Sequence, residues 1–313
     1  MYIEQALKPK NEWWNYLIGL FIIFIGWQVI GVIPLIVVAF MKVDSLQEFE
    51  AAAQNNFVEL GIDKNLFLVL MIFSFAMGLL ALLFAAKFLN RQTIRELTTS
   101  RNKTDWSRIR FSFFLVVGMS SILFLISYFT ESEIYTWNFK AVPFLILFLV
   151  SVLLLPLQTS FEEYLFRGYL MQGLGVITKN RWFPLLFTSV VFGLLHGLNP
   201  EVAKLGNVMM VFYIGTGLLL GVMTLMDDGM ELALGFHAAN NILAAILVTT
   251  DWSALQTDAL FIDTSEPSAG LDIILPILVQ YPLIIFIMAK KYKWSGWKEK
   301  LFGKIKSDIV LEQ

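Results

Sequence analysis

The chain contains no cysteine and few charged residues. Only 15% of its 313 residues are charged and 57% are hydrophobic, whereas about a quarter of the residues in a soluble domain are charged. Without cysteine, neither disulfides nor thiolate metal sites can form. The formal net charge of −2 gives no indication of a nucleic-acid partner, and we expect none. The low charge and a mean hydropathy of +0.69 indicate a multi-pass integral membrane protein.

The apolar residues are gathered in long runs without period-two alternation. Only α-helices and closed barrels can span lipid, and runs of this kind favour helices. A crossing needs about 20 apolar residues. We therefore predict an all-α fold, a polytopic transmembrane bundle of about eight helices. The candidate crossings are 15–41, 66–88, 111–129, 142–174, 183–198, 208–226, 232–249 and 271–289.

Three of these runs have lengths that are unusual for a single straight crossing. The run 142–174 is too long for one straight crossing and contains Pro156, so we expect a kink or a break within it. The run 183–198 is short, and an alternative is that one short run is re-entrant. The run 15–41 is too long for a cleaved signal peptide, and we interpret it as a retained anchor.

No internal repeat is evident, and we divide the chain into three parts. Residues 1–141 hold the first three crossings, with an acidic outer loop and a basic inner loop. Residues 142–250 hold the next four crossings and the unusual polar residues described below. Residues 251–313 hold the last crossing and a basic tail.

Lysine and arginine are distributed unevenly between the connecting segments. Seven lie between 87 and 110, and seven lysines lie between 290 and 306. Eight crossings would place both groups on one side of the membrane. The other side would receive only four basic residues, which are Lys42, Lys64, Lys140 and Lys204. Because basic loops stay in the cytoplasm, we predict that the N- and C-termini are both cytoplasmic.

Adjacent carboxylates interrupt the fourth apolar run. Glu162 and Glu163 point about 100° apart on a helix, and Arg167 lies four residues after Glu163, on the same face. A pair between Glu163 and Arg167 would leave Glu162 without a local cation. Ionisable groups are costly in hydrocarbon and are usually functional there. The alternative is that all three form one structural ion-pair cluster.

The only two histidines of the chain also lie in apolar runs. His196 follows Phe192 by four residues, and His237 precedes Asn241 by four residues, so each pair shares a helix face. A lone histidine in a membrane helix is usually a hydrogen-bonding residue of the core. Two of them together with an intramembrane glutamate pair instead indicate one buried site assembled from three helices.

These residue types suit hydrolysis of an amide bond. A glutamate and an imidazole can deprotonate water, and an imidazole with a carboxamide can stabilise an oxyanion. Alternatively, Glu162, His196 and His237 could ligate Zn²⁺ with water in the fourth position. The helical HExxH signature of many metalloproteases is absent. We favour the metal-free alternative and leave the cofactor open.

Three sequence motifs, in this order, resemble those of a known family. EEYLFR resembles EExxxR, FGLLH resembles FxxxH, and HAANN resembles HxxxN. The set is typical of the CPBP intramembrane proteases, also called the Abi or CAAX-protease family, which includes type II CAAX prenyl endopeptidase. The resemblance covers roughly 145–250 and implies an eight-helix bundle whose cavity opens toward the cytoplasm and the bilayer.

By this resemblance, Glu162 and His196 activate the water, and His237 and Asn241 stabilise the oxyanion. Glu163, Arg167 and Phe192 would support the site. The implied partners are the lipid bilayer and a membrane-associated peptide or protein, of which prenylated CAAX proteins are one class. Two other functions remain open: a noncatalytic membrane partner, such as a bacteriocin-immunity or secretion factor, and a proton-coupled transporter.

Overall fold

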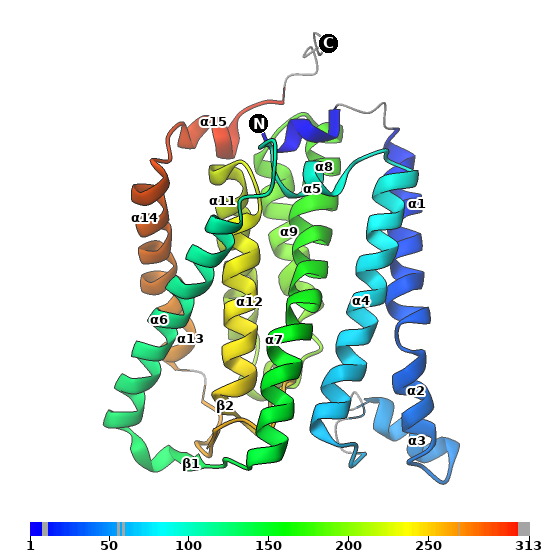
Figure 1. Cartoon of the computed structure of the whole chain (residues 1–313), viewed down its shortest axis with the longest axis vertical. Helices are drawn as coiled ribbons and strands as arrows, with labels where there is room; N and C mark the ends of the chain where they lie inside the picture. The colour runs from blue at the N-terminus through cyan, green and yellow to red at the C-terminus, as the bar shows by residue number, and fades with distance from the viewer. Residues whose placement is uncertain (8–11, 55–56, 58–59, 269, 306–313) are drawn as a thin grey trace.

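A computed structural model describes residues 1–7, 12–54, 57, 60–268 and 270–305. It is an upright bundle of helices with a small sheet at one end and, at the other, the N-terminus and the helix α15 (Trp297–Phe302) (Figure 1). We call these the sheet end and the terminal end. Within the described residues, six helical segments are long and apolar enough to cross a membrane: Trp13–Phe40, Lys64–Phe88, Trp106–Thr130, Ala141–Thr178, Val208–Asp227 and Ile273–Tyr292. The predicted all-α class is confirmed, and the protein is a multi-pass integral membrane protein.

Two shorter helices complete the eight predicted segments. They are α9 (Trp182–Leu195) and α12 (Glu231–Ile246). The other α-helices are α1 (Trp13–Phe24), α2 (Ile33–Phe40), α3 (Leu46–Gln54), α4 (Lys64–Phe88), α5 (Ile94–Thr98), α6 (Trp106–Thr130), α7 (Ala141–Glu163), α8 (Met171–Thr178), α10 (Pro200–Leu205), α11 (Val208–Asp227), α13 (Leu271–Leu275), α14 (Tyr281–Tyr292) and α15 (Trp297–Phe302).

Some helical segments are not regular α-helix. Two 3₁₀ turns span Ile3–Leu7 and Ser132–Ile134, and three π-helical segments span Ile25–Ile30, Tyr164–Leu170 and Pro276–Gln280. The expected irregularity of the fourth crossing is present, but it does not lie at Pro156. Helix α7 continues through Pro156 to Glu163, and the π-helical segment Tyr164–Leu170 joins it to α8. A neighbouring helix can support a proline inside a transmembrane helix, and α4 and α12 both pack along α7.

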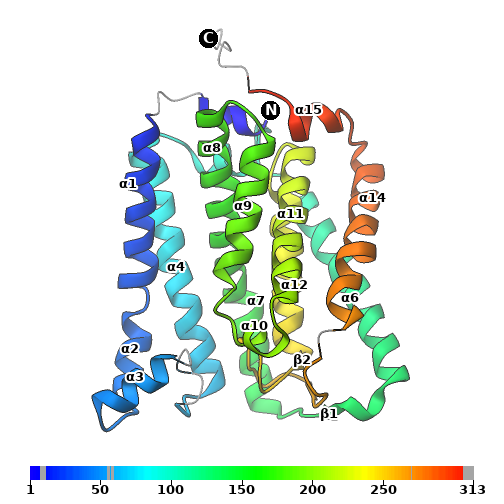
Figure 2. The same ribbon diagram turned by 180° about the vertical axis from the view of Figure 1, so that it is seen from behind.

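The sheet end carries three short strands. Strand β1 (Tyr135–Trp137) pairs antiparallel with β3 (Phe261–Asp263), and β2 (Val248–Thr249) pairs parallel with β3. The connecting segments near this end are partly structured: 42–65 contains α3, and 250–270 contains β3. In Figure 2, α9 stops short of the sheet end, and α10 leads the chain back to α11.

Helix α12 is the central element of the bundle. It lies along α6 and α7 and also contacts α11. Its approach to α6 is close at Gly235, where an added Cβ atom would come within 2.1 Å of the carbonyl oxygen of Ile109. Side chains from α11, α12 and α14 form the largest apolar core. This packing fixes the rotation of α12 and thus the direction in which its polar residues point.

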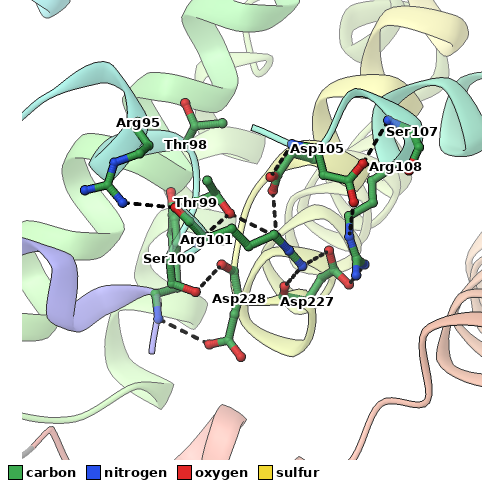
Figure 3. A network of polar contacts seen from close by, with 12 residues as sticks. Arg95, Thr98, Thr99, Ser100, Arg101, Asp105, Ser107, Arg108, Asp227 and Asp228 are labelled. Atoms are coloured by element: carbon green, nitrogen blue, oxygen red, sulfur yellow. Dashed lines mark hydrogen bonds and ion pairs between the residues drawn. The ribbon is translucent and has the colours of Figure 1, made fainter. Parts of the chain in front are cut away.

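An ion-pair network closes the terminal end (Figure 3). Arg101 contacts Asp227 at 2.9 Å and Glu231 at 3.0 Å, and Arg108 also pairs with Asp227. The network joins the segment before α6 to the turn between α11 and α12. Asp105 caps α6 by accepting hydrogen bonds from Ser107, and these bonds lower the pKa of Asp105 because they favour the charged carboxylate.

The N-terminal residues and the segment around α15 also contact this network. The backbone N–H of Tyr2 donates to Asp228 at 3.2 Å, and Lys300 of α15 pairs with the other oxygen of Asp228 at 2.7 Å. The indole of Trp294 donates to Asp227 at 3.0 Å. The terminal end is therefore held by contacts among four separate segments of the chain.

The Gly235 crossing leads to a stability prediction. Gly235→Ala places a methyl group against the backbone of Ile109, and we expect it to lower the free energy of unfolding by about 1–3 kcal/mol, as overpacking does. Thermal unfolding of the purified protein in detergent measures the change. Gly118→Ala on α6 is the matched control, because nothing lies within 4 Å of the added carbon. Equal melting temperatures for the two variants would contradict the prediction.

Candidate active site

The two adjacent glutamates at the end of α7 have different surroundings. The side chain of Glu163 is fully buried and accepts a hydrogen bond from Arg167 at 3.0 Å. The other arm of Arg167 donates to the carbonyl oxygen of Gly217 on α11 at 3.0 Å. The pair predicted from the four-residue spacing is therefore present, and it also attaches α7 to α11.

His237 of α12 lies against both glutamates. Its Nδ1 atom is 2.7 Å from Oε1 of Glu163, and its Nε2 atom is 3.4 Å from Oε2 of Glu162. Since Arg167 contacts the same oxygen of Glu163, one buried carboxylate holds both a guanidinium and an imidazole. The contact therefore brings two carboxyl groups, one guanidinium and one imidazole together.

Gln158 connects Glu162 to Asn241. Its amide nitrogen donates to Oε1 of Glu162 at 2.6 Å, and its amide oxygen accepts from Asn241 at 3.0 Å. Oε2 of Glu162 is buried and has no hydrogen-bond partner among the described residues. The carboxylate is thus held by one oxygen, while the other faces His237.

His196 lies at the end of α9 and approaches the site through Phe192. Its Nδ1 atom is 2.8 Å from the carbonyl oxygen of Phe192. Because a carbonyl can only accept, Nδ1 carries the proton, and Nε2 of a neutral ring is left as an acceptor. The ring stacks on Tyr213 at 4.4 Å between centroids, and the ring of Phe192 lies 4.8 Å from His196 and 6.0 Å from His237.

The predicted residues therefore fall into two groups. One hydrogen-bonded and ion-paired network contains Glu162, Glu163, Arg167, His237 and Asn241. In the part of the chain that the structure describes, His196 contacts this network through the aromatic ring of Phe192, which also lies 4.6 Å from the Arg167 guanidinium. The imidazole that lies against Glu162 is that of His237, whereas the resemblance implied His196.

The metal alternative receives no support from this arrangement. Among the described residues, no group of three His, Asp or Glu side chains is placed to hold a metal ion. Both ring nitrogens of His237 face glutamates, and Nδ1 of His196 bonds a backbone carbonyl. The proposed set of Glu162, His196 and His237 therefore does not fit a metal centre, and we assign it no metal chemistry.

Two neighbours of the site were not singled out from the sequence. Gln158 stands four residues before Glu162, which is the spacing of a shared helix face, so this position could have been found. Tyr213 on α11 had no such signal, because its stacking on His196 depends on how α9 packs against α11.

Known proteins resemble the part of the chain that carries these residues. Residues 138–243 match the family described as type II CAAX prenyl endopeptidase Rce1-like. The Bacillus subtilis (strain 168) protein YyaK, described as uncharacterized, is 28% identical over 251 residues, which cover 78% of this chain and 81% of that protein. No solved structure matches the chain. The predicted family is thus confirmed for the region of the site.

The buried pair gives a prediction for Arg167. Arg167→Met leaves Glu163 as a buried carboxylate without its cation, and such changes cost about 3–5 kcal/mol. We expect a strong fall in the yield of folded protein and in the melting temperature in detergent. The exposed Arg110 provides the control, since Arg110→Met removes the same charge without opening a buried pair. A normal melting temperature for Arg167→Met would show that the pair contributes little to the fold.

Proposed function

We propose that this protein, whose residues 138–243 match the Rce1-like type II CAAX prenyl endopeptidase family, is an intramembrane endopeptidase. It hydrolyses a peptide bond of a membrane-associated protein or peptide. The observation that carries this proposal is the buried Oε2 atom of Glu162, which has no hydrogen-bond partner among the described residues and lies 3.4 Å from His237. A water molecule can contact both atoms at ordinary hydrogen-bond distances.

The reaction begins with the removal of a proton from this water. Glu162 takes the proton through Oε2 while the water oxygen attacks the peptide carbonyl carbon. Negative charge then develops on the carbonyl oxygen. Glu162 returns the proton to the amide nitrogen, the C–N bond breaks, and the products are an amine and a carboxylic acid, which keeps the second proton of the water. No covalent intermediate with the protein is needed.

Other residues of the site position and stabilise these groups. Gln158 holds Oε1 of Glu162, so that Oε2 is the oxygen left for the water. His237 is oriented by Glu163 and contacts the water. His196 and Asn241, which are half-buried, border the side from which the peptide approaches. When Asn241 releases Gln158, its amide N–H can donate to the oxyanion. This assignment gives His237 the place beside Glu162 that the resemblance gave to His196.

A first prediction concerns Glu162. Glu162→Gln keeps the shape of the side chain but cannot take a proton, and we expect cleavage to fall by about 10²–10⁴-fold, the usual contribution of a general base. Purified wild type and variant are compared on a prenylated CAAX peptide and on a mixture of membrane proteins. Cleavage by both at the same rate would remove Glu162 from the mechanism.

Two controls accompany this measurement. Glu133→Gln changes an exposed glutamate at the sheet end and should cleave at the wild-type rate. Wild type is also assayed with and without a chelator, since a metal-dependent hydrolase loses activity when its metal is removed. We expect activity to persist, and its loss together with rescue by Zn²⁺ would contradict the metal-free proposal.

A second prediction concerns Gln158. Gln158→Leu removes a hydrogen bond to a charged group, which is worth about 1.5–3 kcal/mol, so we expect kcat to fall by about 10–100-fold. A kcat equal to that of the wild type would indicate a purely structural role for Gln158.

A further inference from the structure

A hollow apart from the candidate active site lies at the terminal end of the bundle, where α4 ends and α5 begins (Figure 1). Its volume is about 720 Å³, which is in the range of small-molecule binding sites. The last two turns of α4, the turn 89–93 and α5 form its walls, and no residue of the candidate active site is among them. The proposed reaction therefore does not account for this hollow.

The wall that α4 contributes is largely apolar and faces outward. Phe84 and Phe88 are 51% and 60% exposed, and their ring centroids lie 4.7 Å apart. Ile94 of α5, which also lines the hollow, is 55% exposed. Because α4 is one of the six apolar crossings, exposed apolar side chains on it contact lipid chains rather than water. One side of the hollow is therefore open to the bilayer.

The same hollow is lined by three cations. Lys87 lies in the last turn of α4, Arg91 in the turn after it, and Arg95 on α5. No acidic residue lines the hollow in the described part of the chain. Arg95 contacts Glu96 at 3.5 Å. Lys87 and Arg91 are exposed and have no acidic partner among the described residues, so two positive charges remain available to an anion.

The backbone of Arg91 is in the left-handed conformation. Its φ angle is +54°, which is costly for a residue with a side chain. Its two neighbours are buried and hold the turn in place: Asn90 accepts a hydrogen bond from Tyr169 at 2.8 Å, and Gln92 donates one to Gln172 at 2.9 Å. A glycine would adopt this conformation without strain. The arginine is therefore accounted for by its side chain, since strained positions mark functional segments.

Cations and apolar rings lie close together in this hollow. The ammonium group of Lys87 is 5.3 Å from the ring centroid of Phe88, and Phe88 is the last residue of the crossing helix α4. The hollow therefore lies at the level where hydrocarbon gives way to water. A small soluble anion would leave the rings uncovered, and a lipid without net charge would leave both cations unpaired. A phospholipid with a net negative charge satisfies both parts of the hollow.

We propose that this hollow is a binding site for an anionic phospholipid. The phosphate group lies between Lys87 and Arg91, and the first part of an acyl chain lies against Phe84 and Phe88. Basic pockets beside transmembrane helices bind acidic headgroups in this way. Arg95 of α5 adds a third positive charge to the same hollow and so strengthens the field that attracts the headgroup.

This proposal is independent of the endopeptidase function. The phospholipid contacts none of the residues assigned to hydrolysis, and its binding is measured without any cleavage. Failure of either proposal therefore leaves the other standing.

Because the chain contains no cysteine, a single introduced thiol can report on the hollow. Ile94→Cys, at an exposed position in its wall, is labelled with the fluorophore bimane, and the whole protein is reconstituted in phosphatidylcholine nanodiscs. One series contains increasing fractions of phosphatidylglycerol with brominated acyl chains, and the other contains phosphatidylcholine brominated in the same way. Bromine quenches the fluorophore only at close contact, so quenching measures how often each lipid occupies the hollow.

We expect phosphatidylglycerol to reach half-maximal quenching at a mole fraction about tenfold lower than phosphatidylcholine, the order expected for two unpaired cations beside an anionic lipid. Inorganic phosphate, compared with sodium chloride at equal ionic strength, should not change this preference, because it cannot cover the apolar wall. Equal quenching by the two lipids would overturn the proposal. Loss of the preference in phosphate would assign the cations to a soluble anion and would also overturn it.

Matched pairs of substitutions separate the hollow from the general charge of the terminal end. Lys87→Gln with Arg91→Gly removes two cations of the hollow, and we expect folded protein because glycine fits the left-handed backbone of that turn. Arg110→Gln with Lys298→Gln removes the same charge from exposed positions elsewhere at this end. The preference for phosphatidylglycerol should disappear with the first pair and persist with the second. An equal preference in both variants would contradict a site in this hollow.

Discussion

The buried contact between Glu163, Arg167 and His237 is the interaction on which the rest of the site depends. It joins α7, α11 and α12 at a level where lipid would offer no hydrogen bonds. A charge placed there without partners would be prohibitively costly, so each of these groups requires the others. The same contact fixes the imidazole of His237 and the rotation of α7, and thereby decides which oxygen of Glu162 is left unpaired.

Glu162 and Glu163 are neighbours in the chain, but their different contacts suit them to different roles. Glu163 has both a cation and an imidazole as partners, so it serves as a structural anion. Glu162 is held on one side by the neutral amide of Gln158 and keeps a lone oxygen on the other. The two side chains are chemically identical, and they differ only in the face of the helix on which they lie. A carboxylate that takes and returns a proton needs this weaker set of contacts.

Much of the fold followed from the pattern of hydrophobic residues. The eight apolar runs correspond to observed helices, and six of these are long enough to cross a membrane, because lipid imposes a minimum length on a crossing helix. The pair Glu163–Arg167 could also be predicted from the sequence, since it needs only the four-residue spacing on one helix. The π-helical segment Tyr164–Leu170, which lies after Pro156, could not be predicted, because π-helical turns leave no simple signal in the composition.

Contacts between helices were the hardest to anticipate. Which imidazole meets Glu162 depends on the rotation of α9 and α12, and that rotation is set by close approaches such as Gly235 against Ile109. Periodicity places a residue on a face but does not say which neighbour the face meets. For the same reason, the stacking of Tyr213 on His196 and the bridge from Gln158 to Asn241 became visible only in three dimensions.

The π-helical segment Tyr164–Leu170 fixes the rotation of α8 about the helix axis relative to α7. Before it, α7 directs Glu162 and Glu163 toward α12. After it, Tyr169 bonds Asn90 at 2.8 Å and Gln172 bonds Gln92 at 2.9 Å, beyond the end of α4. Removing one residue from this stretch would turn α8 by about 100° relative to α7, so that only one of the two sets of contacts could survive. The length of this stretch is therefore as constrained as the identity of the acids beside it.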